Sequence, residues 1–185
     1  MTGNRIWAVA IVAFALAWVL AGIVTSKAIA TLAGDLDVEV RLAGRDLALP
    51  IAAGRPVANR ESYALEIPAA RGTAVVATDN GRVLRLAATP GRGVTLYQTD
   101  TGNDVIYAYA HLERIADGLR EGSTIKRGDV IGYVGAHDKS VLGPRLHFEI
   151  LRLPRDKQWA NATAIDPAPF FMKAKASPTL AISSH

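Results

Sequence analysis

The chain has no cysteine among its 185 residues and only four histidines. The absence of cysteine excludes disulfide bonds, although it does not distinguish an exported protein from a cytosolic one. The scarcity of histidine leaves few places for a metal or acid–base site, and the first histidine is His111. No repeat and no low-complexity segment is present, so the length predicts one domain of ordinary size.

The excess of positive over negative charge is also small, since the formal net charge is only +4. No basic patch is interleaved with aromatic residues, which argues against nucleic acid as a partner. The excess is densest near the C-terminus, where Arg152, Arg155, Lys157, Lys173 and Lys175 outnumber Asp156 and Asp166. We expect residues 172–185 to form a disordered, basic tail with a solvated surface that could approach anionic lipid or wall polymers.

One long apolar run is present, from Ile6 to Val24, and it holds 19 residues without a charge. About 20 such residues cross the hydrocarbon core of a bilayer, so residues 1–27 predict a cytoplasmic stub and a single transmembrane anchor. The alternative is a secretory signal peptide with Ala28-Ile29-Ala30 as its cleavage site, but a typical apolar region of about 7–15 residues is shorter than this run. Arg5 before the span favours a cytoplasmic N-terminus, which places the rest in the periplasm or outside the cell.

After the span the apolar residues alternate with period 2. The pattern from Asp35 to Leu42 predicts a half-buried strand, and Asp46 to Ile51 predicts a second one. Ala43-Gly44-Arg45 would turn the first strand into the second, so residues 28–61 are predicted to form a stalk and a β-hairpin.

The remaining sequence predicts short strands separated by glycine turns. Candidate strands are residues 63–67, 74–78, 82–88, 94–99, 104–110, 130–134 and 146–152. The turn signals are Asp79-Asn80-Gly81, Pro90-Gly91-Arg92-Gly93 and Asp100-Thr101-Gly102-Asn103. A short helix or turn is expected at residues 112–117. This pattern is typical of an all-β antiparallel sandwich or barrel-like fold.

The last of these strands carries three functional groups. Arg145, His147 and Glu149 project to one face, while the apolar residues that alternate with them face the other way. A single histidine on a strand is more often a surface or hydrogen-bonded residue than a metal ligand, so this strand alone does not predict a metal site.

Six motifs that follow one another along the chain make a metal-related site at His147 more plausible than the strand alone does. They are Gly72-Thr73, Asp79-Asn80-Gly81-Arg82-Val83, Tyr109-Ala110-His111-Leu112, Gly122-x-x-Ile125-x-x-Gly128-x-x-Ile131-Gly132-x-x-Gly135, Gly143-Pro144-Arg145-Leu146-His147-Phe148-Glu149 and Ile165-Asp166-Pro167. In this order and spacing, residues 62–171 resemble the lysostaphin-like (LytM) endopeptidase family. The resemblance implies a peptidase-type domain with a barrel-like core of the duplicated hybrid motif.

The resemblance also implies a zinc site. The family holds Zn²⁺ through a His and an Asp of a His-x-Gly-x-Asp segment and through the second His of a His-x-His strand. Two further histidines help to activate water and stabilise the oxyanion during cleavage of peptide cross-bridges. Three protein ligands and an open water position are typical of catalytic zinc.

The matching positions of this sequence depart from that pattern. His147 stands at the metal-ligand position of the strand, and His111 at a catalytic position, but Arg145 replaces the other catalytic histidine. Counting back from Gly72-Thr73 places Glu66 at the ligand aspartate and Ser62 at the ligand histidine, so two of the three ligands are altered.

These replacements are unfavourable for zinc. A Glu66 carboxylate could still bind a metal, whereas a serine hydroxyl at position 62 is a poor ligand. The Arg145 guanidinium cannot act as a base, and its charge opposes a dication; pairing with Glu66, with Glu149 or with a ligand carboxylate is expected. His137, in the loop of residues 135–140, is the one alternative source of a missing nitrogen.

The sequence therefore predicts a membrane-anchored extracytoplasmic member of this family that is non-catalytic and needs no cofactor. A groove formed by Ser62, Glu66, His111, Arg145, His147 and Glu149 would bind peptidoglycan or an envelope protein partner, or regulate cell-wall hydrolysis. One alternative is an active zinc metalloendopeptidase that cleaves peptidoglycan cross-bridges. Another is a structural subunit of an envelope membrane complex.

A further alternative is a lipoyl or biotinyl carrier. Residues 122–131 followed by Asp138-Lys139 are similar to such a carrier, in which Lys139 would hold the prosthetic group. This reading leaves Arg145, His147 and Glu149 without a role, and the predicted anchor removes the domain from cytosolic lipoylation enzymes.

Overall fold

The computed structural model describes residues 37–39, 41–89, 93–135 and 143–172. The chain divides into two compact units, Met1–Gly44 and Arg45–His185. The predicted anchor, residues 173–185 of the predicted tail, His137 and Lys139 all lie outside the described residues. Among the helices described here, none is both long enough and apolar enough to cross a membrane.

In the first unit, residues 37–39 and 41–43 are helical, so the strand predicted from Asp35 to Leu42 is wrong. Val38 and Leu42 are buried, whereas Asp37 and Arg41 are exposed and form an ion pair of 3.2 Å. Residues four apart lie on the same face of a helix, so two of the alternating apolar residues, Val38 and Leu42, also share a face in a helix. The pattern was therefore ambiguous, and the helix is what forms.

The predicted partner strand, residues 46–51, is also wrong, and no hairpin forms with the segment before it. The segment instead runs beside β3 (Ala74–Val76), because the Ala48 N–H donates to the Thr78 carbonyl and the Val76 N–H donates to the Pro50 carbonyl, both at 2.9 Å. Ile51 is buried at the end of this segment. Residues 45–51 are therefore part of the second unit.

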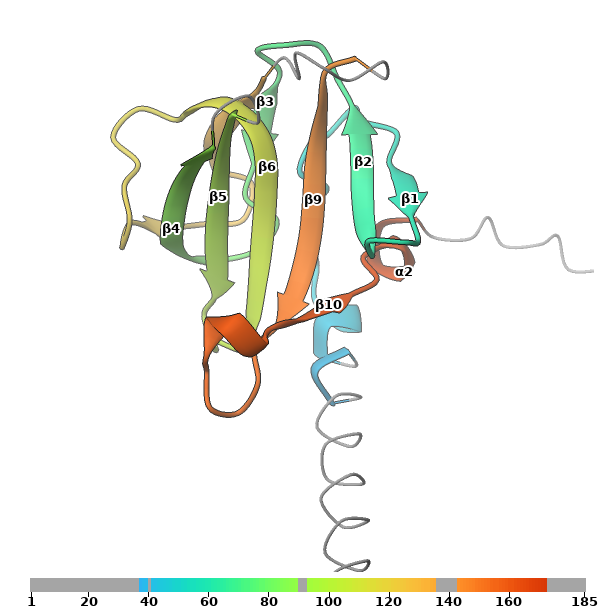
Figure 1. Cartoon of the computed structure of the whole chain (residues 1–185), viewed down its shortest axis with the longest axis vertical. Coiled ribbons are helices and arrows are strands. Elements are labelled where there is room, and N and C mark those ends of the chain that lie inside the picture. The colour runs from blue at the N-terminus through green and yellow to red at the C-terminus, as the bar shows by residue number, and fades with distance from the viewer. Residues whose placement is uncertain (1–36, 40, 90–92, 136–142, 173–185) are drawn as a thin grey trace, which may run out of the picture. The chain divides into compact units, whose positions relative to one another are not determined.

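The second unit is built on one antiparallel sheet of ten strands. The strands are β1 (Val57–Asn59), β2 (Ala64–Pro68), β3, β4 (Gly81–Thr89), β5 (Gly93–Asp100), β6 (Val105–Ile115), β7 (Thr124–Ile125), β8 (Val130–Val134), β9 (Arg145–Arg152) and β10 (Thr163–Ile165). Their hydrogen-bonded order is β1-β2-β9-β6-β5-β4-β7, with β10 on β9 and with β8 paired to both β3 and β6. The strands from β1 to β4 can be followed in this order in Figure 1. The predicted all-β antiparallel fold is confirmed, and each of the seven strands predicted after residue 62 is present.

Short elements were not predicted. They are β1, β7 and β10, the 3₁₀ turn η1 (Trp159–Asn161) and the helix α2 (Ala168–Phe171). Each has four residues or fewer, which is too short to produce a periodic pattern.

The short helix or turn predicted at residues 112–117 is wrong for most of that range, because β6 continues to Ile115 and a turn begins only at Asp117. A bulge lets the strand change partners: Ala110 is paired with His147 of β9, whereas Leu112 is paired with Val134 of β8. His111, between them, has a left-handed backbone with φ of 65°. The bulge disturbs the alternation that would otherwise identify a strand.

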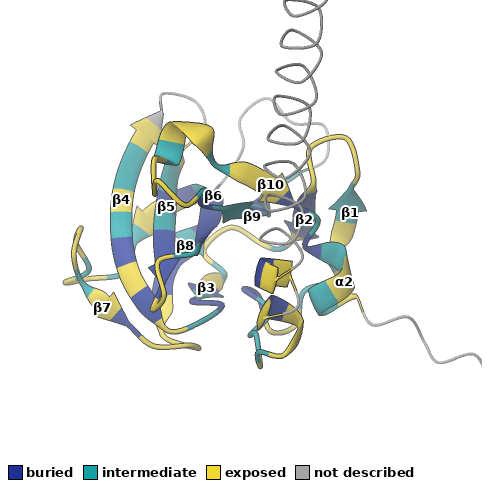
Figure 2. Cartoon of the chain, turned by 90° about the horizontal axis from the view of Figure 1, so that it is seen from below, coloured by how far each residue is buried: buried dark blue, intermediate teal, exposed yellow. Residues whose placement is uncertain are grey.

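The core lies on one face of the central strands. Along β9, Leu146, Phe148 and Ile150 are fully buried. Phe148 packs against Tyr109 of β6, with ring centroids 5.3 Å apart, and against Phe171 of α2 at 5.7 Å. Buried and exposed bands alternate along β4 (Figure 2), as expected for strands with one buried face. The opposite face of β9 is left for its polar residues.

Candidate functional site

The candidate site lies on the open face of β9, between β2 and β6. The register pairs Glu66 of β2 with His147, and pairs His147 in turn with Ala110 of β6. Residues directly opposite each other share a face of the sheet. This register therefore places a carboxylate, an imidazole and a small side chain next to one another across three strands.

Four polar side chains on this face form a closed network, which we call the β2–β9 network: Glu66, Arg145, His147 and Glu149. Arg145 Nε donates to Glu66 Oε2 at 2.8 Å, and its Nη1 donates to the Gly143 carbonyl at 3.0 Å. His147 contacts Glu66 Oε1 through Nδ1 at 2.7 Å and Glu149 Oε1 through Nε2 at 2.9 Å. The expected pairing of Arg145 with Glu66 is found.

The network is electrostatically balanced. Hydrogen bonds to Glu149 and Glu66 raise the pKa of His147 to about 9, although partial burial opposes the shift. Burial alone would raise the pKa of Glu66, but the hydrogen bond and charge of His147, together with Arg145, outweigh it and lower that pKa. At neutral pH two cations therefore face two carboxylates.

His111 lies beside this network. Its ring centroid is 5.9 Å from that of His147, and the two rings are inclined by 67°. A positive φ is uncommon for a residue other than glycine and marks a position that the surrounding structure has to hold. The bulge in β6 thus brings the second predicted histidine to the site.

Ser62 does not join the cluster. It is exposed, in the turn between β1 and β2, and its backbone N–H donates to Asn59 Oδ1 at 3.4 Å. Within the part of the chain that the structure describes, no hydrogen bond links the Ser62 side chain to the β2–β9 network. The structure therefore brings together five of the six predicted residues, Glu66, His111, Arg145, His147 and Glu149.

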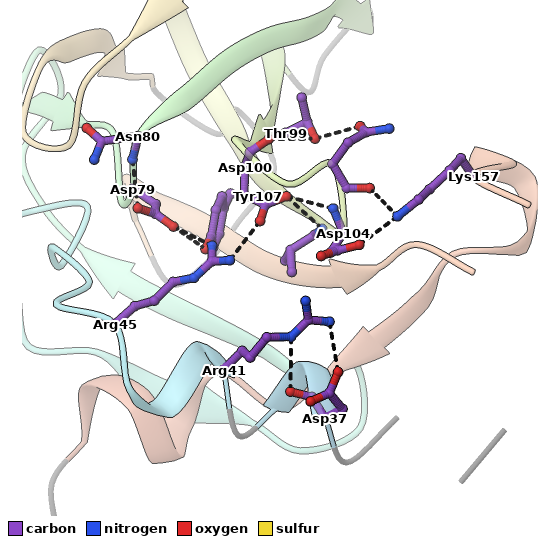
Figure 3. A network of polar contacts seen from close by, with 12 residues as sticks. Asp37, Arg41, Arg45, Asp79, Asn80, Thr99, Asp100, Asp104, Tyr107 and Lys157 are labelled. Carbon is purple, nitrogen blue, oxygen red and sulfur yellow. Dashed lines mark hydrogen bonds and ion pairs between the residues drawn. The ribbon is translucent and has the colours of Figure 1, made fainter. Parts of the chain in front are cut away.

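A second polar cluster was missed by the sequence analysis. We call it the Arg45 network: Arg45, Asp79, Asp100 and Tyr107 (Figure 3). Arg45 donates to Asp79 Oδ2 at 2.8 Å and to Asp100 Oδ2 at 2.9 Å, and the Tyr107 hydroxyl donates to Asp79 Oδ2 at 3.1 Å. The available signal was Tyr107 itself, because a buried tyrosine usually has a hydrogen-bond partner for its hydroxyl.

Comparison with known proteins identifies the domain. Residues 60–167 match the model of peptidase family M23. The chain belongs to peptidase family M23. This confirms the resemblance to lysostaphin-like endopeptidases.

Solved structures agree with this assignment. Csd3 of Helicobacter pylori shares 26% identity with a TM-score of 0.53, over 67% of this chain and 32% of that one. Lysostaphin from Staphylococcus simulans, described as an antimicrobial peptidase, shares 25% identity with a TM-score of 0.52, over 70% of this chain and 54% of that one. A putative M23 peptidase from Pseudomonas aeruginosa, at 22% identity and a TM-score of 0.53, covers 75% of this chain and 60% of that one and supports the fold alone.

The chain therefore spans between about a third and three fifths of the length of these three structures. No curated protein matches it.

The donors of this M23 domain do not fit a zinc ion. Zinc needs a lone pair on a neutral imidazole nitrogen or on a carboxylate oxygen, at about 2.0–2.2 Å. Both ring nitrogens of His147 face carboxylate oxygens, and both oxygens of Glu66 face donors. The described residues contain no group of three or more His, Asp or Glu side chains arranged to hold a metal. Arg145 adds a fixed positive charge beside these donors, because its Nε binds Glu66 Oε2 at 2.8 Å.

Proposed function

We propose that this M23 domain is a non-catalytic, extracytoplasmic binding domain of the cell envelope, tethered by the apolar run from Ile6 to Val24. It would bind peptidoglycan peptides or an envelope protein partner and so regulate cell-wall hydrolysis. The observation that carries this proposal is the closed β2–β9 network, in which Arg145 occupies the place of a catalytic histidine and engages Glu66 at 2.8 Å.

The network is accessible enough to bind. The side chains of Arg145, Glu66, His147 and Glu149 are between 13% and 29% exposed, so they are shielded but reach the surface. An arginine with a fixed geometry suits recognition of a carboxylate, and the two glutamates suit an amine or backbone N–H groups. A peptide presents both kinds of group, which makes peptide the ligand class that the site supports.

The test is a pelleting assay with purified peptidoglycan sacculi, using the full chain in detergent. We expect wild-type protein to co-sediment and to release no soluble fragments. Arg145→Ala should weaken co-sedimentation by about tenfold, equivalent to about 1.4 kcal/mol. Arg82→Ala, which removes an exposed arginine from β4, is the matched control and should bind like wild type.

Two other outcomes would decide against this proposal. Equal binding by wild type and Arg145→Ala would exclude the network as the binding site and would favour a structural subunit of an envelope complex. Release of soluble fragments by the wild-type chain would show an enzyme.

The active endopeptidase is the second candidate because His111 is retained beside His147 at 5.9 Å, on a backbone held at a positive φ. An enzyme of this kind would lose fragment release in His111→Ala while still binding sacculi. A binding domain has no such activity to lose.

A further inference from the structure

Two aromatic rings and a cation lie close together at one end of the sheet, and we call them the Trp159 cluster: Arg85 of β4, Tyr97 of β5 and Trp159 of η1. Arg85 and Tyr97 are paired across the two strands. The ring centroids of Tyr97 and Trp159 are 4.5 Å apart, with the planes inclined by 62°. The guanidinium carbon of Arg85 lies 5.8 Å from the centroid of the Trp159 ring.

The register places the Trp159 cluster in line with the β2–β9 network. Tyr97 is paired with Ala108 of β6, and Ala108 is paired in turn with Glu149 of β9. Residues directly opposite each other share a face of the sheet, so Tyr97 lies on the same face as Glu149. Two strand spacings of about 4.8 Å put these two residues about 10 Å apart. A ligand of this length can contact both the cluster and the network.

The turn that carries Trp159 is held in place by the turn between β5 and β6. The Leu153 N–H donates to the Asp104 carbonyl at 2.9 Å. Lys157 Nζ donates to the Asn103 carbonyl at 2.8 Å and to Asp104 Oδ1 at 2.6 Å. Lys157 also has a φ of 55°, an uncommon backbone that surrounding contacts have to hold. The position of Trp159 is therefore fixed before a ligand arrives, which lowers the entropy cost of binding.

The polar groups of the Trp159 cluster have no partner among the described residues. Within that part of the chain, no hydrogen bond or ion pair engages the Arg85 guanidinium, the Tyr97 hydroxyl or the Trp159 indole N–H. Arg85 is exposed, and the two aromatic residues are half-buried. Tyrosine and tryptophan usually find a hydrogen-bond partner when they are buried. The cluster thus combines apolar ring surface with donors that are available to a ligand.

We propose that the Trp159 cluster binds the sugar chain of peptidoglycan. A pyranose ring has C–H groups on its flat face, which pack against an aromatic ring, and hydroxyl and amide oxygens at its edge, which accept hydrogen bonds. The guanidinium, the phenol and the indole N–H are the matching donors. The inference rests on the proposed function and narrows it, because it selects peptidoglycan over an envelope protein as the ligand. A peptide on the β2–β9 network would place its attached sugar near the cluster.

The fluorescence of Trp159 tests this proposal directly. The chain has three tryptophans, so the background variant Trp7→Phe/Trp18→Phe leaves Trp159 as the sole one. This full chain, in detergent, is titrated with chitotetraose, a chain of N-acetylglucosamine units without peptide. A parallel titration uses stem peptides that an amidase has released from sacculi, which carry no sugar.

Arg85→Ala and Tyr97→Ala are compared in the same background. The matched control is Tyr133→Ala, because Tyr133 of β8 also packs against an arginine, with the Arg114 guanidinium carbon 3.7 Å from its ring centroid. Thermal melting of each protein establishes that it is folded. Arg85 is exposed, so Arg85→Ala should fold even if Tyr97→Ala does not.

We expect chitotetraose to cause a saturable shift of the Trp159 emission and the stem peptides to cause none. Tyr97→Ala should weaken chitotetraose binding about tenfold, because the sugar loses one of its two rings. Arg85→Ala should weaken it about threefold, through the loss of one charged donor. Tyr133→Ala should bind like the background protein.

The absence of a saturable shift with chitotetraose would overturn the inference. Unchanged binding by folded Arg85→Ala would overturn it as well, and so would a shift caused by the stem peptides alone, which would assign the cluster to peptide. These outcomes are separable from the proposed function. Sacculi that still bind through Arg145 would leave the proposed function intact when chitotetraose does not bind, whereas chitotetraose binding that persists when Arg145→Ala has no effect on sacculi would support the inference alone.

Discussion

Two arginine-centred networks occupy different environments in the same domain. In the β2–β9 network, Arg145 and its partners lie on the open face and every side chain keeps some exposure. In the Arg45 network, the Asp100 side chain is fully buried, and the Tyr107 residue is as well. The chemistry is similar, but one carboxylate of the Arg45 network is fully buried, whereas no side chain of the β2–β9 network is.

The partners of the acidic groups differ in the same way. Asp100 also accepts hydrogen bonds from the backbone N–H groups of Asp104 and Val105, at 2.8 and 3.1 Å (Figure 3). Burial raises the pKa of Tyr107 far above its usual range, and the charge of Asp79 adds to this shift. The Arg45 network therefore connects two segments, the one that contains Arg45 and the turn between β5 and β6, to the buried Asp100 carboxylate. The comparison separates a cluster that joins distant segments around a buried carboxylate from one that lies on the open face of β9.

Substitution of Asp100 should have the largest effect on stability and is the first test of this comparison. Asp100→Ala should reduce the free energy of unfolding by about 3 kcal/mol, because it leaves Arg45 Nη2 and two backbone N–H groups without their acceptor. Urea denaturation followed by circular dichroism measures this change.

The control is Asp46→Ala. Asp46 pairs with Arg127 at the surface, and its side chain is 87% exposed, so the change should stay below about 0.5 kcal/mol. A cost for Asp100→Ala as small as that of the control would show that the Arg45 network does not hold the fold.

Arg45 should give the next largest effect. Arg45→Met removes the cation that spans Asp79 and Asp100 and leaves the buried Asp100 carboxylate without its charged partner. We expect a loss of about 2 kcal/mol, less than for Asp100→Ala because the Arg45 side chain is 28% exposed.

A double-mutant cycle with Asp79→Asn checks whether the pair acts as a unit. A coupling energy of about 1 kcal/mol is expected for residues that share one network. Strict additivity of the two changes would mean that Arg45 and Asp79 stabilise the fold independently.

These two networks also mark what the sequence could predict. Arg145, His147 and Glu149 alternate along one strand, and their common face follows from period 2 alone. The pairing of Arg145 with Glu66 required only the charge argument. The site on β9 was therefore largely predictable once the motif order had located both strands.

The Arg45 network was not predictable by the same reasoning. Asp79 and Asp100 stand in sequences whose turn chemistry already accounts for an aspartate. Arg45 stands in what was predicted to be a hairpin turn. Their contacts join positions 34 and 55 residues apart, and no local pattern encodes a pairing of that kind. A local pattern also failed at residues 35–42, where Val38 and Leu42 share a face in a helix as well as in a strand.

His147 should give the smallest of the expected effects on the free energy of unfolding. It also distinguishes the two networks, because we expect only the contribution of the β2–β9 network to change with pH near neutrality. Its pKa is raised from 6.5 to about 9 in the folded chain, so the protonated form is favoured by folding. Its contribution is fully present below about pH 6.5 and is lost as pH rises through about 9. After allowance for solvent screening we expect about 1–2 kcal/mol, measured as the difference in unfolding free energy between pH 6 and pH 10.

His147→Gln should remove most of that difference, whereas Asp100→Ala, although less stable at every pH, should keep it. An equal pH slope in wild type and His147→Gln would mean that the imidazole is not held as a cation between Glu66 and Glu149.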